Sequence, residues 1–514
     1  WTIESPPLPT TLIHTQSKLE SFSFDPASHQ PRKMTDKAKR SRTHFNGSHH
    51  PVVDFWRREV GGISPRSFSD RFSASENMVL RLEIYRKLAK HKGCVNTVSF
   101  NAQGDILVSG SDDRRVLLWD WELGNVKLSF HSGHSNNVFQ AKFMPFSDDR
   151  TIVTCAADGM VRRASVLESG KVETVLLGLH QGPAHKLCIE PGNPHIFYTC
   201  GEDGLVQRFD LRTQAPTELF TCQAVNPRRR HLEAAQLNAI AMDPRNSNLL
   251  AVGGMDEYAR LYDIRRLHGD GSSRAADHFA PPHLIGDLHV GITGLAFSEQ
   301  SELLVSYNNE FVYLFTHDMG LGSNPMPSSP EDDSKSSVPM AYKGHKNVET
   351  VKGVNFCGPR SEYVVSGSDC GRIFIWKKRS GELIRVMEAD RYVVNCIEPH
   401  PHIPVLASSG IENDIKVWTS KAAERATLPD NIEMQRKRKP RGWMYRVSSP
   451  RELLAQLFFL QNRSRFSEDR EEGEASSSST GRELLDLILN FNDDDDEHVS
   501  DNGEDGVSRD DFFS

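Results

Sequence analysis

The sequence lacks the features that mark zinc sites, membrane spans and secreted chains. Among its 514 residues are eight cysteines but no CxxC pair, and a zinc site needs clustered thiolate or imidazole ligands. No apolar run approaches the roughly 20 residues of a membrane helix, and the start lacks the charged-then-apolar pattern of a secretory signal. We therefore expect a soluble chain of the nucleus and cytoplasm whose cysteines are buried free thiols.

Signatures of catalysis are missing as well. The sequence has no phosphate-cradling glycine loop, no nucleophile elbow and no convergent set of metal ligands. Its middle has no concentrated basic stripe of the kind that binds nucleic acid. We expect a chain that catalyses nothing, holds no cofactor or metal, and binds neither membrane nor nucleic acid directly.

What the sequence does contain is an internal repeat. Seven units run from about residue 91 to residue 418, and each ends in an apolar stretch with an aromatic residue or its replacement. These end positions are Trp119, Ala164, Phe209, Tyr262, Phe315, Trp376 and Trp418. The first spacings are 45 residues, close to the ~40–45 residues of a WD-repeat blade.

A second regularity supports the repeat. Six residues before each end position stands a carboxylate, an amide or, once, a cysteine: Asp113, Asp158, Asp203, Asp256, Asn309, Cys370 and Glu412. A histidine opens six of the units: His91, His134, His180, His231, His289 and His345. The seventh unit has Asp390 and Arg391 in that place.

This pattern predicts a buried polar tie in each blade. The histidine would bind the turn carboxylate and be linked onward to Ser or Thr and the Trp indole. Such a network is tolerated only when every group is satisfied, and it then fixes one geometry. His/Asp pairs also occur in metal and acid–base sites, but these pairs lie in separate units and cannot converge. We interpret them as structural.

The expected fold is an all-β, seven-bladed WD-repeat propeller, in which ring closure removes long exposed sheet edges. Leu80, Leu82 and Ile84 alternate before the first unit and would supply the outer strand of the last blade. The expected domains are a disordered basic tail (1–50), a helical arm with the closing strand (51–90), the propeller (91–420) with a flexible insertion (318–340), and a C-terminal tail (421–514).

Charge is distributed unevenly over the ends of the chain. The net charge is −8. The start of the chain is basic, and the stretch formed by roughly the last 45 residues is strongly acidic. The basic run at residues 436–441 is either a nuclear-import signal or a solvated linker. Short amphipathic helices are expected near residues 449–460 and 480–491. We expect the acidic end to be disordered.

Several segments go beyond a generic propeller: residues 138–143, 351–356, 366–371 and 395–402. With them, the chain resembles the DDB- and cullin-associated factors over residues 54–418. The resemblance implies a substrate receptor of a cullin-RING ubiquitin ligase. Such a receptor binds the ligase's large damaged-DNA-binding adaptor and presents protein substrates to it.

The family's adaptor mark is an aromatic residue, Asp, any residue and Arg at a blade end. Two stretches match it, residues 209–212 and residues 262–265, with the candidate contacts Asp210, Arg212, Asp263 and Arg265. An exposed arginine there can make charge-assisted hydrogen bonds across an interface. The alternative is an ordinary blade-end arginine, because propellers that bind no ligase also carry the motif.

The resemblance also implies a helical segment that docks on the adaptor. Phe55 and Trp56, in the polar arm before the propeller, would serve as anchors or would pack on the propeller's own side. A different function stays open at this point. A non-catalytic scaffold, for instance a chromatin-associated propeller, would bind histone tails through its central channel.

Overall fold

The computed structural model describes residues 51–213, 215–223, 234–267, 274–323, 325 and 338–429. It divides into two units, the first formed by residues 1–286 and 290–434. Every described helix and strand belongs to that unit, and only residues 287–289 of the second are described. The expected N-terminal tail, the basic run, the C-terminal amphipathic helices and His231 lie outside the described residues.

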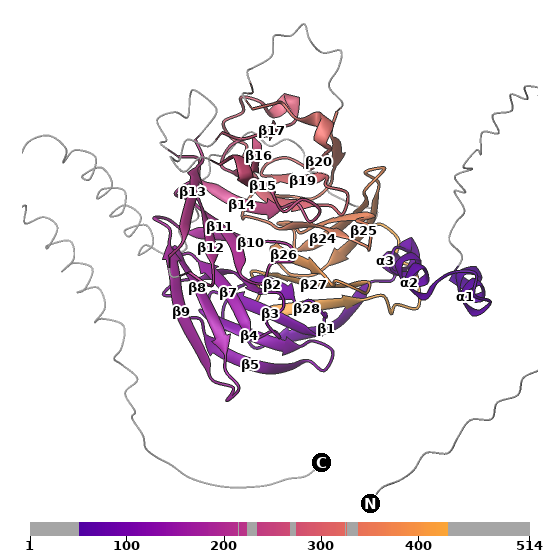
Figure 1. Ribbon diagram of the computed structural model, residues 1–514. Coiled ribbons are helices and arrows are strands. Elements are labelled where there is room, and N and C mark those ends of the chain that lie inside the picture. The colour runs from indigo at the N-terminus through magenta and orange to yellow at the C-terminus, as the bar shows by residue number, and fades with distance from the viewer. Residues whose placement is uncertain are drawn as a thin grey trace, which may run out of the picture. The chain divides into compact units, whose positions relative to one another are not determined.

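The described strands form seven antiparallel sheets of four strands each (Figure 1). Blades one and two are β2 (Val95–Phe100), β3 (Ile106–Ser111), β4 (Arg115–Asp120), β5 (Asn125–His131), and β6 (Val138–Phe143), β7 (Thr151–Ala156), β8 (Met160–Val166), β9 (Val172–Leu179). Blades three and four are β10 (Ala184–Ile189), β11 (Ile196–Gly201), β12 (Leu205–Asp210), β13 (Thr217–Thr221), and β14 (Leu237–Met242), β15 (Leu249–Gly254), β16 (Ala259–Asp263), β17 (Asp277–Phe279).

The remaining blades follow the same plan. Blades five and six are β18 (Ile292–Phe297), β19 (Leu303–Tyr307), β20 (Val312–Phe315), β21 (Met340–Tyr342), and β22 (Val354–Cys357), β23 (Tyr363–Ser366), β24 (Arg372–Lys377), β25 (Leu383–Glu388). Blade seven is β26 (Val394–Pro399), β27 (Val405–Gly410), β28 (Asp414–Thr419) and β1 (Glu83–Ala89). The described helices are α1 (Pro51–Glu59), α2 (Pro65–Ser73), α3 (Glu76–Leu80) and the short 3-10 turns η2 (Ile264–Arg266), η3 (Pro282–Leu284) and η4 (His317–Met319).

The first strands of the blades form the inner ring. Each of them contacts the first strand of the next blade, and β26 contacts β2, which closes the circle. Figure 1 shows β2, β10, β14 and β26 near the middle and β5, β9 and β13 at the rim. The expected seven-bladed all-β propeller is confirmed.

Blade seven combines both ends of the propeller. β1 pairs antiparallel with β28, from Glu83 opposite Thr419 to Ala89 opposite Asp414. The strand starts later than the alternating leucines suggested, because Leu80 lies in α3. Leu88 is instead its most deeply buried residue.

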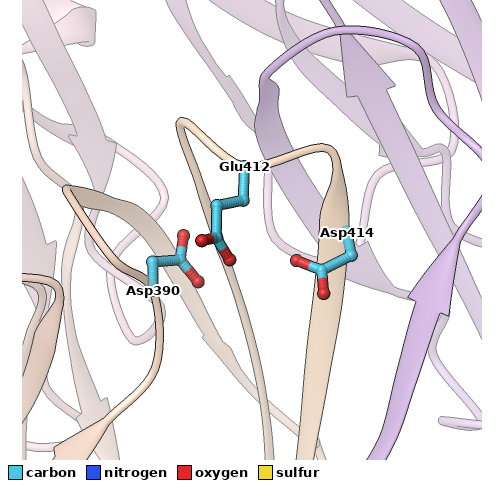
Figure 2. A group of neighbouring side chains, drawn as sticks. All are labelled: Asp390, Glu412 and Asp414. Atoms are coloured by element: carbon cyan, nitrogen blue, oxygen red, sulfur yellow. The ribbon is translucent and has the colours of Figure 1, made fainter.

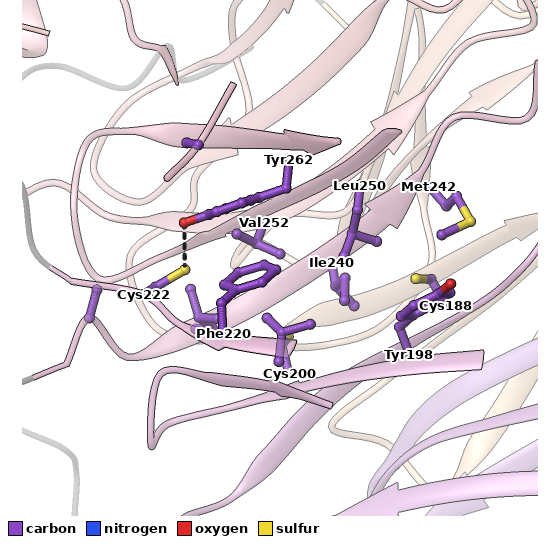
Figure 3. Packing of buried hydrophobic residues seen from close by; sticks show 14 of the residues in the cluster. Cys188, Tyr198, Cys200, Phe220, Cys222, Ile240, Met242, Leu250, Val252 and Tyr262 are labelled. Atoms are coloured by element: carbon purple, nitrogen blue, oxygen red, sulfur yellow. Dashed lines mark hydrogen bonds between the residues drawn. The ribbon is translucent and has the colours of Figure 1, made fainter. Parts of the chain in front are cut away.

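The hydrophobic core lies between neighbouring blades. In the cluster between blades three and four, Phe220 stacks on Tyr262 and Cys222 approaches the Tyr262 hydroxyl at 3.4 Å (Figure 3). A sheet packed on both faces buries nearly continuous apolar strands, as β11 and β15 show. Blade interfaces of this kind hold the ring together.

All eight cysteines are free, as expected, but they are not uniformly buried. Cys155, Cys188, Cys200, Cys222 and Cys357 are buried, whereas Cys94 and Cys396 are half-buried. Burial raises the pKa of the Cys188 thiol to about 12, so this group is an inert core residue. The expectation is wrong for Cys370, which is exposed in the β23–β24 turn.

Part of the expected flexible insertion has local structure. The insertion at 318–340 starts within η4 and ends in β21, and its residues 324 and 326–337 lie outside the described part. The outer strand of blade four is β17, which lies between η2 and η3 in the chain. Among the described residues, none of the helices has the length and apolar character to cross a membrane.

Candidate protein-interaction surface

The complete polar tie occurs in blade one. His91 Nδ1 lies 2.9 Å from Asp113 Oδ2, and His91 Nε2 lies 2.7 Å from Ser109 Oγ. The Trp119 indole donates to the same Ser109 oxygen at 2.8 Å. Burial lowers the pKa of His91, which favours the neutral ring that this chain of hydrogen bonds requires.

Blades two and three have a shorter tie. His134 and His180 bind Asp158 and Asp203 through Nδ1 and the hydroxyls of Thr154 and Thr199 through Nε2, with distances between 2.8 and 3.2 Å. The chain stops at threonine because Ala164 and Phe209 have no indole N–H to donate.

The turn carboxylate is also held by backbone groups. Burial by itself would raise the pKa of Asp158, but hydrogen bonds and charge from His134, with the N–H groups of Ser135 and Met160, lower it to about 2. The next residue, Gly159, has φ +76°, and a Cβ there would lie 2.6 Å from the His180 carbonyl oxygen. The turn therefore selects glycine.

In blade four a buried cation binds the turn carboxylate. Asp256 accepts hydrogen bonds from Arg260, with Nη1 at 2.9 Å from Oδ1, and both side chains are only 2% exposed. Arg260 lies in β16, two residues before Tyr262. The contact predicted between Asp256 and His231 lies outside the described residues.

Blade seven has a buried cation at the strand position that Arg260 occupies in blade four. Lys416, two residues before Trp418, contacts Asp390, Glu412 and Asp414, whose carboxylates point toward one another (Figure 2). The oxygens of these three groups lie within 4.8 Å of one another, a spacing that could hold a metal ion. The Lys416 ammonium already supplies the positive charge there, and Trp418 donates to Ser408 at 2.9 Å.

The prediction that His345 forms the polar tie of blade six is wrong. Neither ring nitrogen of this buried histidine has a hydrogen-bond partner in the described part of the chain. Cys370 stands at the position where the tie needs a carboxylate. The neighbouring Asp369 pairs instead with the buried Lys352. Burial and the Lys352 charge lower the pKa of His345 to about 3, so it remains neutral.

The aromatic partners also change in blades five and six. Trp376 donates to the Lys343 carbonyl at 2.9 Å rather than to a serine, and its ring meets that of His345 edge-on. In blade five the Tyr313 hydroxyl binds Glu310 at 3.1 Å. Tyr313 again lies two residues before the aromatic end position, Phe315. The sequence signal for these contacts is a long polar side chain two residues before the end position, as in Arg260, Tyr313 and Lys416.

The opposite ends of β12 and β16 carry the two candidate arginines. Arg212 binds Asp210 through Nε and Nη2 at 2.9 and 2.7 Å, and Arg265 binds Asp263 at 3.0 and 2.7 Å. The arginine side chains are 61% and 62% exposed. The Arg265 hydrogen bonds lower the pKa of Asp263 to about 2.

These two arginines share one face of neighbouring blades. Asp203 precedes β12 and Asp210 ends it, as Asp256 precedes β16 and Asp263 ends it. The arginines therefore lie at the strand ends remote from the polar ties. An aspartate fixes each guanidinium group by two hydrogen bonds, and most of the arginine side chain remains exposed to a partner.

The arm exposes aromatic side chains. Phe55 and Trp56 of α1 are 48% and 63% exposed. The Phe55 ring packs edge-on against Phe68 of α2 with 5.0 Å between centroids, and Arg71 pairs with Asp54 at 3.0 Å. The two helices thus support each other and leave the Trp56 indole accessible.

Helix α3 is anchored on the last two blades. Val79 and Leu82 belong to the core cluster of blades six and seven. Tyr363 donates to the Ala74 carbonyl at 2.8 Å, and Arg81 donates to the Ala422 carbonyl at 2.7 Å. The end of the arm therefore has a defined place on the ring.

Comparison with known proteins identifies the repeat. The family model "WD domain, G-beta repeat" matches residues 82–120 and 337–377. The chain is a WD-repeat propeller. The first match covers β1 to β4, so it includes the strand that closes blade seven.

Three relatives match about half of this chain. Mouse DDB1- and CUL4-associated factor 6 is 31% identical over 279 residues, covering 52% of this propeller chain and 31% of the relative. Protein ALTERED SEED GERMINATION 2 of Arabidopsis thaliana is 32% identical (49% and 38% covered), and human WD and tetratricopeptide repeats protein 1 is 31% identical (51% and 42% covered). The chain thus spans only 31–42% of the length of these relatives.

Proposed function

We propose that this chain is a non-catalytic substrate receptor of a cullin-RING ubiquitin ligase. Its face with Arg212 and Arg265 binds the large damaged-DNA-binding adaptor, and its other surfaces recruit protein substrates. The observation that carries the proposal is the matched pair of exposed, carboxylate-braced arginines on adjacent blades.

The bracing gives these arginines the properties of interface contacts. Arginine loses side-chain freedom when it binds a partner, and a side chain already held by an aspartate loses less. Asp210 and Asp263 each fix the guanidinium plane by two hydrogen bonds and are themselves largely covered. The remaining N–H groups are free to reach acceptors on an adaptor.

The arm supplies a second, apolar contact in this proposal. Exposed Trp56 and Phe55 in an otherwise polar helix are suitable anchors, because tryptophan and aromatic residues dominate interface energetics. The name of the mouse relative, DDB1- and CUL4-associated factor 6, describes the same type of assembly for that protein. A finer assignment, to member eight of the DDB- and cullin-associated factors, remains a prediction from residues 138–143, 351–356, 366–371 and 395–402.

The test is binding of the purified full chain to the purified adaptor. Wild type is expected to form a 1:1 complex, and Arg212→Ala with Arg265→Ala is expected to weaken it by about 30-fold or more, since arginine hot spots contribute ~2 kcal/mol or more. Trp56→Ala is expected to weaken it separately. Isothermal titration calorimetry measures each dissociation constant.

A matched control is the double variant Arg115→Ala with Arg372→Ala. Both arginines start third strands, at the ends of the blades remote from Arg212 and Arg265. This variant is expected to bind the adaptor like wild type. A wild-type chain that does not bind the adaptor contradicts the proposed function and favours a general scaffold, whereas undiminished binding by the Arg212/Arg265 variant contradicts only the assigned contacts.

A further inference from the structure

The turn between β6 and β7 has an unusual backbone. Phe146, Asp148 and Asp149 all adopt left-handed conformations there, with φ of +56°, +50° and +58°. Every other turn in the described part of the chain has at most one such residue besides glycine. A bulky side chain rarely takes a left-handed conformation, which glycine and asparagine adopt more easily. Phenylalanine at position 146 is therefore unfavourable for the backbone.

Hydrogen bonds hold this turn in place. Within it, Ser147 Oγ donates to the Met144 carbonyl at 2.7 Å, and the Arg150 amide donates to the Ser147 carbonyl at 3.0 Å. Asn101, in the corresponding turn of blade one, donates to Asp149 Oδ2 at 2.7 Å. The left-handed residues thus belong to a turn that is braced from within and from the neighbouring blade.

The Phe146 side chain gains no burial in return. It is 78% exposed, more than any other phenylalanine, tyrosine or tryptophan that the structure describes. A core residue would offset an unfavourable backbone with buried apolar area, and an exposed ring does not. Backbone outliers of this kind gather at sites that bind a ligand or a partner. The turn therefore points to a role for the exposed ring in binding.

Phe146 lies at the same end of the ring as the two candidate arginines. Strands β6 and β12 both start at the end that holds the polar ties, and both finish at the other end. Met144, two residues before Phe146, and Leu211, next to Arg212, pack in the core cluster shared by blades two and three. Phe146 and Arg212 therefore share one face on adjacent blades.

Further apolar side chains are exposed at this end of blades one and two. Leu123 lies in the turn between β4 and β5, and Leu167 lies in the turn between β8 and β9. The Val166 amide donates to the Arg150 carbonyl at 2.8 Å, which joins the turn of Leu167 to that of Phe146. The face thus has an apolar part on blades one and two and an arginine part on blades three and four.

We propose that Phe146 is an anchor of the adaptor-binding face, and that its ring enters an apolar pocket of the adaptor beside the Arg212 contact. This inference rests on the proposed function and extends its interface from blades three and four to blade two. Aromatic and arginine residues are both enriched at protein interfaces, where aromatic anchors fill pockets near the centre. The braced turn presents the ring in one position before binding, so little conformational entropy is lost.

The experiment measures binding of the purified full chain to the purified adaptor by isothermal titration calorimetry, together with the melting temperature of each variant. Phe146→Asn removes the ring and places a residue that tolerates the left-handed backbone. It is expected to weaken adaptor binding by about tenfold or more. Its melting temperature is expected to equal or exceed that of wild type, because the exposed ring does not stabilise the fold. Phe146→Tyr keeps the ring and is expected to bind like wild type.

The matched control is Tyr392→Asn. Tyr392 is 64% exposed and precedes β26, at the end of the ring with the polar ties, so this variant is expected to leave adaptor binding unchanged. Undiminished binding by Phe146→Asn, a melting temperature of that variant below wild type, or equal weakening by Tyr392→Asn would overturn the anchor alone. A wild-type chain that does not bind the adaptor would contradict the proposed function and the anchor with it.

Discussion

At the scale of residues, the blades show that one structural task can be met by different chemistry. A turn carboxylate needs a buried donor, and His91, His134 and His180 supply it in three blades. Arg260 and Lys416 supply it from the third strand in two others. A permanently charged donor differs from a neutral histidine, because losing it leaves a buried carboxylate without a counter-charge.

Asp158 gives the tie a defined acid sensitivity. Its pKa is about 2 in the folded chain, below the ordinary value of 3.8, so its contribution to stability is complete above pH 3.8 and is lost as pH falls through about 2. Asp158→Asn is expected to destabilise the protein at pH 6 by about 2 kcal/mol. The difference from wild type should shrink as the pH falls from about 4 to about 2.

Urea unfolding at several pH values measures this difference. Glu168→Gln is the control, since Glu168 is 90% exposed and should change stability by less than about 0.5 kcal/mol. A gap between wild type and Asp158→Asn that is the same at pH 3 and pH 6 would contradict the assigned role of the ionised carboxylate.

At the scale of elements, β1 is the strand on which closure depends. It is separated from β28, its partner, by more than three hundred residues of sequence, and it covers an edge of the last blade. Its inward side chain Leu88 is only 1% exposed and packs in the cluster shared by blades seven and one. An uncovered edge strand would expose unpaired backbone groups to other chains.

Leu88→Ala is therefore expected to lower the free energy of unfolding by about 2–5 kcal/mol, through the lost apolar contact and the cavity left behind. Leu176→Ala is the matched control, because Leu176 is 50% exposed on outer strand β9. Urea midpoints measure both. Equal, small effects of the two substitutions would show that β1 does not hold the ring closed.

At the scale of the whole molecule, the ring separates its surfaces. The polar ties lie at one end of the third strands and the arginine pair at the other. Sites that share no partner act independently when they are far apart. The closed fold thus allows one chain to carry several binding surfaces.

Much of the architecture could be predicted from local pattern. The seven recurring end positions from Trp119 to Trp418 predicted seven blades, because each blade repeats the same short-range turns and strands. The histidine–aspartate pairs of the first three blades were also visible, since both partners recur at fixed positions within a unit. The pairs of Asp210 with Arg212 and of Asp263 with Arg265 were also within reach of the sequence, because the motif supplied by the family resemblance places each arginine two residues after its aspartate.

The tertiary structure decided which group satisfies each buried charge. His345 has no hydrogen-bond partner among the described residues, while Lys352, two residues before β22, pairs with Asp369. No spacing rule in the sequence contains that pairing. The inner ring likewise joins first strands from seven distant segments, so the contact between Ser99 and Glu398 exists only once the ring is closed. Sequence by itself determined the repeat because a blade is a local unit, whereas pairing across strands and blades depends on which side chains the closed ring brings together.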